Sequence, residues 1–360
     1  MAKFLMSLSV SLLFLTACIS GGNKSVSVRW LSSTKTVRRD TSRLISYPYK
    51  IKLADSLVFV LDLRAGDGSF VQVFSYPELK YITSIGKKGR GPNELLTLPC
   101  FDIYEGHVYL LDPHKMFLMR YALHRIAAGE DRPDTVVAYP PTLGPILSYK
   151  ITSRGLLVAA NSRKRRIAEL SVADTTPLWS IDLPDYADMD PDPVPEKYEL
   201  SLWNSVIGCR ESPRMVVNAT QLGDLLEIYR ENGEGVISII GKGGLPGVIR
   251  AGRRVSIGKM DGFSDVQIYG NRIYALYSGA DRSEMYRLER KGRVAPSGCD
   301  HLLIYDSVGT VLAQYRLDCH VSGFDIDEDN GVLIMVDPNS EEPICTAPLP
   351  EIGIPESVSN

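Results

Sequence analysis

The sequence predicts an all-β protein, a six-bladed β-propeller made of four-stranded antiparallel blades. Short apolar runs recur at intervals of about 50 to 60 residues, the length of one such blade. The 360 residues include 30 glycines and 22 prolines, as expected of a chain with many turns. No segment keeps an apolar period of 3.6 residues, so no helical domain is expected.

Six apolar runs mark the second strand of each blade. Their central residues are Phe59, Tyr109, Val158, Val217, Tyr274 and Ile334. Residue pairs that adopt the positive φ angles of tight hairpins precede three of the runs. These pairs are Glu105-Gly106, Gly270-Asn271 and Asn330-Gly331.

The first and last blades define how the ring closes. In the first blade, four strands are predicted in order over residues 49–53, 57–62, 70–74 and 80–85. The last blade runs out of chain after Ile344, because the prolines that follow cannot serve a central ladder. We expect the N-terminal segment 26–31 to supply the missing outer strand, so that an N-terminal strand closes the last blade.

The N-terminus predicts export and a lipid anchor. An apolar run over residues 4–16 follows Lys3 and is too short to span a bilayer. It ends at Ala17-Cys18, which resembles the bacterial lipobox. That resemblance implies cleavage after Ala17 and acylation of Cys18 by fatty acids such as palmitate. The alternative is an ordinary small-residue cleavage site with a chance cysteine.

These signals divide the chain into four parts. We expect a lipoprotein signal peptide over 1–17, a flexible lipid-anchored linker over 18–25, the propeller over 26–350 and a C-terminal tail over 351–360. Forty basic and 43 acidic residues give a net charge of −3, which excludes the broad basic excess of a dedicated nucleic-acid binder.

Five cysteines remain after signal cleavage. They are Cys100, Cys209, Cys299, Cys319 and Cys345. In an oxidising compartment an odd number leaves at least one unpaired, and the sequence leaves the pairing open. Most are expected to be buried as small hydrophobic residues. The five histidines have no zinc-ligand spacing, so neither a metal nor a cofactor is predicted, and no catalytic motif is present.

One glycine-rich loop is the candidate ligand site. It consists of Gly86, Lys87, Lys88, Gly89, Arg90 and Gly91. Successive N–H groups in such a turn can cradle an anion, and the three cations add positive charge. The loop lacks the Gly-Lys-Ser/Thr ending of a P-loop and follows a strand, so the alternative is a plain turn between blades.

Three further clusters have simpler interpretations. The acidic spacing Asp188, Asp190, Asp192 imitates a calcium loop, but Pro193 stands where that loop needs glycine, which favours a solvated insertion. The basic run 163–166 is expected at a solvated hairpin tip. A group of carboxylates is expected to meet near the propeller axis. These are Asp62, Asp112, Asp265 and Asp325.

The segment 85–94, followed by an inner strand and the run 108–113, resembles the blade junction of the TolB-like six-bladed propeller lipoproteins of Bacteroidota. The ending 341–343 is similar to that family too, and the resemblance covers about residues 40–350. It implies a propeller anchored in the cell envelope. The absence of acidic residues over 19–24 favours the periplasmic side of the outer membrane.

The fold and the absence of a catalytic motif predict a non-catalytic binding or scaffold module for an envelope protein or a glycan. The alternative is a carbohydrate-active lyase or hydrolase with its site at the mouth of the axial channel.

Overall fold

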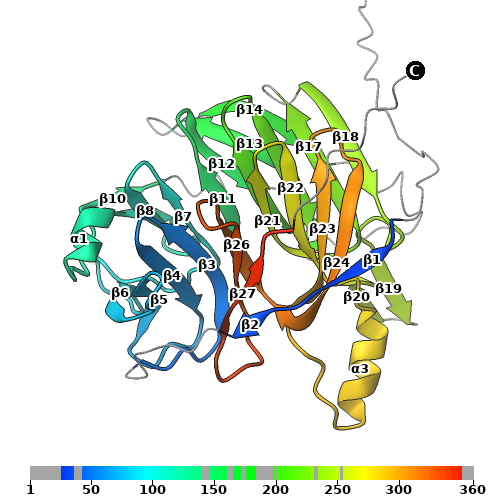
Figure 1. Cartoon of the computed structure of the whole chain (residues 1–360). Helices are drawn as coiled ribbons and strands as arrows, with labels where there is room; N and C mark the ends of the chain where they lie inside the picture. The colour runs from blue at the N-terminus through cyan, green and yellow to red at the C-terminus, as the bar shows by residue number, and fades with distance from the viewer. Residues whose placement is uncertain are drawn as a thin grey trace, which may run out of the picture.

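Six β-sheets surround a central axis in the computed structural model, and each is one blade of a propeller (Figure 1). The structure describes residues 26–35, 43–139, 146–159, 165–171, 176–183, 198, 201–230, 234–251 and 254–350. The predicted signal peptide, linker and C-terminal tail therefore lie outside the described residues.

The first four blades each contain four consecutive antiparallel strands, ordered from the axis outwards. Blade 1 contains β3 (Pro48–Ala54), β4 (Leu57–Asp62), β5 (Ser69–Ser75) and β6 (Tyr81–Lys87). Blade 2 contains β7 (Phe101–Tyr104), β8 (His107–Asp112), β9 (Phe117–Ala122) and β10 (Thr135–Ala138). Blade 3 contains β11 (Ser148–Ile151), β12 (Gly155–Ala159), β13 (Arg165–Ser171) and β14 (Pro177–Asp182). Blade 4 contains β15 (Ser205–Arg210), β16 (Met215–Thr220), β17 (Leu225–Arg230) and β18 (Glu234–Ile240).

The last two blades take strands from both ends of the chain. Blade 5 contains β21 (Phe263–Tyr269), β22 (Arg272–Tyr277), β23 (Cys299–Asp306), β24 (Val311–Val321) and β1 (Val28–Leu31). Blade 6 contains β25 (Gly323–Asp327), β26 (Val332–Val336), β27 (Ile344–Pro348) and β2 (Thr34–Lys35). A separate hairpin, β19 (Val248–Ala251) with β20 (Arg254–Ile257), lies between blades 4 and 5 in the chain.

An N-terminal strand closes the last blade, as predicted, but it is not the predicted segment. β2 pairs antiparallel with β27 in blade 6. The preceding strand β1, within the segment expected to do this, pairs parallel with β24 and adds a fifth strand to blade 5 (Figure 1). Only two residues separate β1 from β2, so the N-terminus joins two neighbouring blades.

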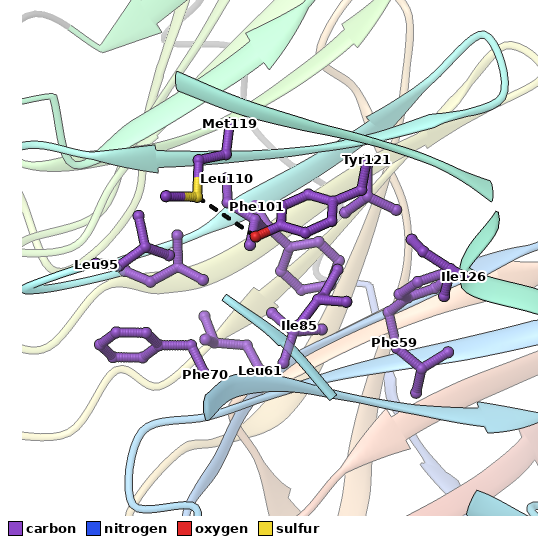
Figure 2. Close-up of a cluster of buried hydrophobic side chains, with 14 of the residues drawn as sticks. Phe59, Leu61, Phe70, Ile85, Leu95, Phe101, Leu110, Met119, Tyr121 and Ile126 are labelled. Carbon is purple, nitrogen blue, oxygen red and sulfur yellow. Dashed lines mark hydrogen bonds between the residues drawn. The ribbon is translucent and has the colours of Figure 1, made fainter. Parts of the chain in front are cut away.

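The core lies between the faces of adjacent blades. Every residue of β4 is buried, because a second strand is covered by neighbours on both faces. Between blades 1 and 2, the ring centroids of Phe59 and Phe101 lie 6.5 Å apart. In Figure 2 aliphatic and aromatic side chains from both blades fill this space, with the Tyr121 hydroxyl donating to Met119 Sδ at 3.4 Å. Burial of this apolar surface stabilises each blade against the next.

Of the three predicted hairpin pairs, one has positive φ angles at both residues, and in the other two only the glycines, Gly270 and Gly331, have them. Glu105 and Gly106 have φ angles of 43° and 71°, and they join β7 to β8. Two successive positive φ angles give the backbone twist that a two-residue hairpin needs. The tight turn therefore follows from the Glu-Gly pair itself.

The two faces of the ring carry different connections. The first strand of each blade starts on the face that receives the link from the previous blade, so the second-to-third-strand links lie there too. We call this the connection face; its longest described segments are 88–100, 241–251, 254–262, 278–298 and 337–343. Helix α3 (Arg282–Arg290) projects from it in Figure 1. The opposite turn face carries short turns and the helix α1 (Leu123–Ala127).

Candidate functional site

Charged side chains gather at the axis, where the first strands of the blades meet. Strand β3 contributes two lysines and β11 one, while β7, β21 and β25 contribute one aspartate each. These residues are Lys50, Lys52, Asp102, Lys150, Asp265 and Asp325. They bring three positive and three negative groups together from five blades.

The charges are paired with one another across the blades. Lys50 Nζ lies 3.2 Å from Asp265 Oδ1, which joins blade 1 to blade 5. Asp102 Oδ1 receives two lysines, Lys150 Nζ at 3.1 Å and Lys52 Nζ at 3.6 Å. The Asp102 side chain is 5% exposed, so little solvent screens these pairs. The pairs therefore link blades 1, 2 and 3.

Burial perturbs these groups in opposite directions. Burial, together with the positive charge of Lys150, lowers the pKa of Lys52. Burial also acts to lower the pKa of Lys150, but the combined effects of Asp102, Lys52 and Asp265 outweigh it and the net pKa is raised. Burial raises the pKa of Asp325, although its carboxylate accepts a hydrogen bond from Leu53 N–H at 2.8 Å. Lys52 is thus the lysine least favoured in its charged form.

Little free space remains around these charges. The cavity in the channel measures about 40 Å³, room for a water molecule or two. Blade 4 faces the same cavity with Ser205, Val206 and Ile207. The ion pairs therefore fill the centre of the ring and tie its blades together.

A larger pocket of about 190 Å³ opens at the mouth of the channel on the connection face. Hydroxyl groups and backbone dominate its lining. The hydroxyl-bearing residues are Tyr47, Tyr49, Ser264, Ser278, Ser297 and Ser322. Asp261 is the carboxylate among the described lining residues, and burial raises its pKa against the opposing effect of Arg282. Arg282 Nη1 lies 3.6 Å from Asp261 Oδ1.

The glycine-rich loop 86–91 already contains an anion of its own chain. The Glu94 carboxylate accepts a hydrogen bond from Gly91 N–H at 2.8 Å and lies 3.2 Å from Lys87 Nζ. A Cβ at Gly89 would overlap Glu94 Oε2, so a larger residue there would displace the Glu94 carboxylate. The hydrogen bond from Gly91, with that from Lys87, lowers the pKa of Glu94. A carboxylate thus lies where we expected an external anion to bind.

The other side chains of this loop point to different partners. Lys88 Nζ donates to Leu63 O at 3.2 Å and lies 4.9 Å from the centre of the Phe70 ring. Arg90 is exposed, and Gly86 has a φ of 72°. A pocket of about 360 Å³ lies beside Lys87, Gly91 and Glu94. Ligand binding by residues 86–91 remains a prediction.

Two of the four carboxylates expected at the axis lie elsewhere. Asp62 and Asp112 end the second strands of blades 1 and 2 and hold the connecting loops. Asp62 accepts hydrogen bonds from the N–H groups of Ser46 and Tyr47 at 2.7 and 2.9 Å. Asp112 accepts from His114 N–H at 2.8 Å. That expectation was wrong, because a residue at the end of a second strand lies one strand away from the axis.

The basic run 163–166 is not entirely solvated, contrary to expectation. Residues 163 and 164 lie outside the described residues, but Arg166 is 1% exposed. Its guanidinium Nη2 lies 2.9 Å from Glu227 Oε2, and its Nη1 donates to Trp203 O at 2.8 Å. The Trp203 ring lies 5.2 Å from the guanidinium carbon. Arg166 therefore joins blade 3 to blade 4, which a count of charges along the sequence could not show.

No group of three or more His, Cys, Asp or Glu side chains that could hold a metal ion occurs in the described ranges. Asp188, Asp190, Asp192 and Pro193, the predicted imitation of a calcium loop, lie outside them. All five described cysteines are free thiols. Burial raises the pKa of Cys100 to about 12 and that of Cys209 to about 11.

The sequence analysis missed the most prominent feature of the connection face, helix α3. Its N-cap residue Asp281 accepts hydrogen bonds from Ser283 and Glu284 N–H at 2.7 and 3.3 Å. Asp281 and Glu284 have the spacing of a capping box, a signal that could have predicted the start of the helix. None of the side chains of α3 is buried. Arg282, Met285 and Leu288 are half-buried, and the other side chains of α3 are exposed.

Comparison with known proteins agrees with the geometry. The TolB-like 6-blade propeller-like family matches residues 29–329. The chain belongs to this family. No curated protein matches the TolB-like chain in sequence. Its fold is similar to the solved structure of U3-55K, with 10% identity, a TM-score of 0.51 and coverage of 87% of this chain and 98% of that one. The RRP9 WD40 repeats match with 10% identity, a TM-score of 0.51 and coverage of 89% and 99%.

Proposed function

We propose that this TolB-like propeller is a lipid-anchored module of the cell envelope that binds another envelope protein through its connection face, without catalysis. The observation that carries the proposal is the α3 arm, residues 281–294, which projects from this face (Figure 1). A rigid ring that displays a projecting element suits recognition.

The chemistry of the α3 arm favours a protein with an acidic surface. Three exposed, positively charged residues lie close together at its tip: Arg290, Lys291 and Arg293. None of them forms an ion pair with a described residue. Beside them, Val294 is 93% exposed and Tyr286 49%. Positive charge around exposed apolar and aromatic groups is typical of a surface that is steered to a partner and then buried against it.

The axial charges support a role without catalysis. Each lysine at the centre pairs with an aspartate of the same chain, so these groups are already engaged. A glycosidase usually needs two carboxylates beside its substrate, and the mouth pocket has Asp261 alone among its described lining residues. The carbohydrate-active enzyme is therefore the less favoured alternative.

The anchor belongs to the same proposal. Acylation of Cys18 would place the lipid ten residues before β1, and residues 19–25 would serve as a tether. In related phyla an acidic stretch soon after the lipid cysteine marks export to the cell surface. Residues 19–24 have no acidic side chain, so we propose the periplasmic side of the outer membrane. Within the described residues, no helix has the length and apolar character that crossing a membrane requires.

The test is mild crosslinking and co-purification of the full lipidated chain from its native envelope, with Cys18→Ala as the unanchored form. A stoichiometric protein partner is the expected result. Recovery of the chain alone, or with a bound saccharide only, would contradict the proposal that it binds a protein partner. That result would favour glycan binding or the alternative of a carbohydrate-active enzyme.

A matched pair of variants locates the binding surface. Lys291→Glu/Val294→Asp changes the α3 arm and should lower the partner yield at least about fivefold. Lys80→Glu/Val308→Asp makes the same changes at exposed positions of the turn face and should leave the yield unchanged. Equal yields from the two variants would show that the α3 arm is not the binding surface.

A further inference from the structure

Two cysteines face each other where blade 5 meets blade 6. Cys319 lies on β24 and Cys345 on β27, and their Sγ atoms are 4.0 Å apart. Of the other described cysteines, Cys100 precedes β7 of blade 2 and Cys209 lies on β15 of blade 4, while Cys299 begins β23 of blade 5. Among the described residues, this is the cysteine pair with a sulfur–sulfur contact.

The two sulfurs lie directly under the N-terminal crossing from β1 to β2. Ser33 Oγ, in that crossing, lies 3.5 Å from Cys319 Sγ. The Ser33 backbone N–H donates to Asp318 Oδ1 at 3.1 Å, and its hydroxyl donates to the same oxygen at 2.7 Å. Lys35 of β2 is the register partner of Cys345. The pair therefore lies at the seam where the ring closes.

The distance is within reach of a covalent bond. Disulfide sulfurs lie about 2.05 Å apart, so the two must approach by roughly 2 Å. A change of side-chain torsion in one or both cysteines moves a sulfur by a distance of this size. Cys345 is buried and packs in the same apolar cluster as residues of β24, which keeps the two strands together.

We propose that Cys319 and Cys345 form a disulfide that joins blade 5 to blade 6 beneath the N-terminal crossing. The other three cysteines remain thiols, in keeping with the odd number of cysteines after signal cleavage. The inference does not depend on a partner or on the lipid anchor. It needs only an oxidising environment that supplies a disulfide donor, a dithiol–disulfide exchange protein or oxidised glutathione.

The exchange proceeds in two balanced steps. The Cys319 thiolate attacks one sulfur of the donor disulfide, forms a mixed disulfide and releases the other donor sulfur as a thiolate. The Cys345 sulfur then attacks Cys319 Sγ, forms the internal disulfide and releases the second donor thiolate. The two thiol protons pass to the released thiolates, and the donor gains the two electrons that the cysteines lose.

The surroundings assign the order of attack. Cys319 is partly exposed, whereas Cys345 is buried, so an exchange protein reaches Cys319 first. The hydrogen bond from Cys345, and then that from Ser33, lowers the pKa of Cys319. A lowered pKa raises the thiolate fraction, the form that attacks a disulfide.

The test uses the Cys18→Ala chain, purified without reductant and then treated with oxidised glutathione. Thiols are alkylated after unfolding, and peptides are mapped by mass spectrometry with and without prior reduction. We expect one cross-linked peptide pair that contains Cys319 and Cys345, and alkylation of the other three. Full alkylation of all five cysteines without reduction, or a cross-link between other cysteines, would overturn the proposal.

Thermal unfolding gives a second readout. The disulfide should raise the Tm of the oxidised chain by roughly 5 °C over the reduced chain. The difference should vanish in Cys319→Ala/Cys345→Ala and persist in the matched control Cys100→Ala/Cys209→Ala. A difference of the same size in both variants would rule out this pair as its source.

Discussion

Asp102 should be the most sensitive residue of the axial network. It is 5% exposed and faces Lys150 at 3.1 Å and Lys52 at 3.6 Å, while its Oδ2 accepts Ile151 N–H at 2.8 Å. Asp102→Asn keeps the shape and an acceptor oxygen but removes the charge. Two lysines, with side chains 14% and 16% exposed, then face each other, and the other axial carboxylates, Asp265 and Asp325, lie beyond ion-pair distance of them. Loss of one partner from a buried ion pair typically costs about 3 to 5 kcal/mol.

The assay is urea unfolding of the Cys18→Ala chain, followed by circular dichroism and tryptophan fluorescence to check that the two transitions coincide. Asp131→Asn, at an exposed position, should change the free energy of unfolding by less than about 0.5 kcal/mol. A loss below about 1 kcal/mol for Asp102→Asn would refute the reasoning.

A double variant separates charge from packing. Burial lowers the pKa of Lys52, so Lys52→Met removes a positive charge that burial disfavours. Asp102→Asn/Lys52→Met should recover at least about 1 kcal/mol relative to Asp102→Asn, because the like-charge pair is gone. No recovery would mean that the cost of Asp102→Asn comes from hydrogen-bond geometry rather than from charge.

Three further outcomes follow from the packing and the charges. Phe59→Ala should lower the free energy of unfolding by about 3 to 5 kcal/mol, because Phe59 is 0% exposed between blades 1 and 2. Arg166→Ala should cost a similar amount, about 3 to 5 kcal/mol, because it leaves Glu227 without its buried partner. NMR titration of Glu94 should give a pKa below its ordinary value of 4.5, so its stabilising effect exists above that value and is lost as pH falls through the lowered pKa.

Each of these outcomes has a control and a contrary result. Leu178→Ala, at a position 45% exposed, should cost far less than Phe59→Ala. Arg166→Ala/Glu227→Gln should be more stable than Arg166→Ala, and equal stability would show that no charge had been stranded. A Glu94 pKa at or above 4.5 would show that the N–H of Gly91 does not hold the carboxylate in solution.

The blades could be predicted from the sequence because their signals are local. Apolar runs and pairs such as Glu105-Gly106 specify strands and turns within a few residues. The axial network could not be predicted, because Lys50 and Asp265 come from blades 1 and 5 and meet only when the ring has closed. Asp62 was misplaced because it was grouped with Asp265 and Asp325, which lie on first strands, although its own run 57–62 is a second strand and lies one strand away from the axis.

The candidate binding surfaces could also be predicted only in part from the sequence. The loop 86–91 could be found from its glycines, but no local pattern predicts that the Glu94 carboxylate lies inside it. Helix α3 was overlooked because the search relied on a sustained apolar period, and in this nine-residue helix Met285 and Leu288 are the aliphatic side chains that could show one. The capping box at Asp281 and Glu284 is independent of that period and was the better guide.

The N-terminal segment supplies one strand to blade 5 and one to blade 6, and it therefore limits when these blades can finish folding. β2 is made near the beginning of synthesis, yet its partner β27 ends at Pro348, so blade 6 is completed only when nearly all of the chain is present. Blades 1 to 4 have no such dependence, since each is contiguous in the chain. A product truncated before β27 would thus present unpaired edges at β2 and β26, and such edges recruit other strands. The ring can therefore close only in a chain that has been synthesised as far as β27.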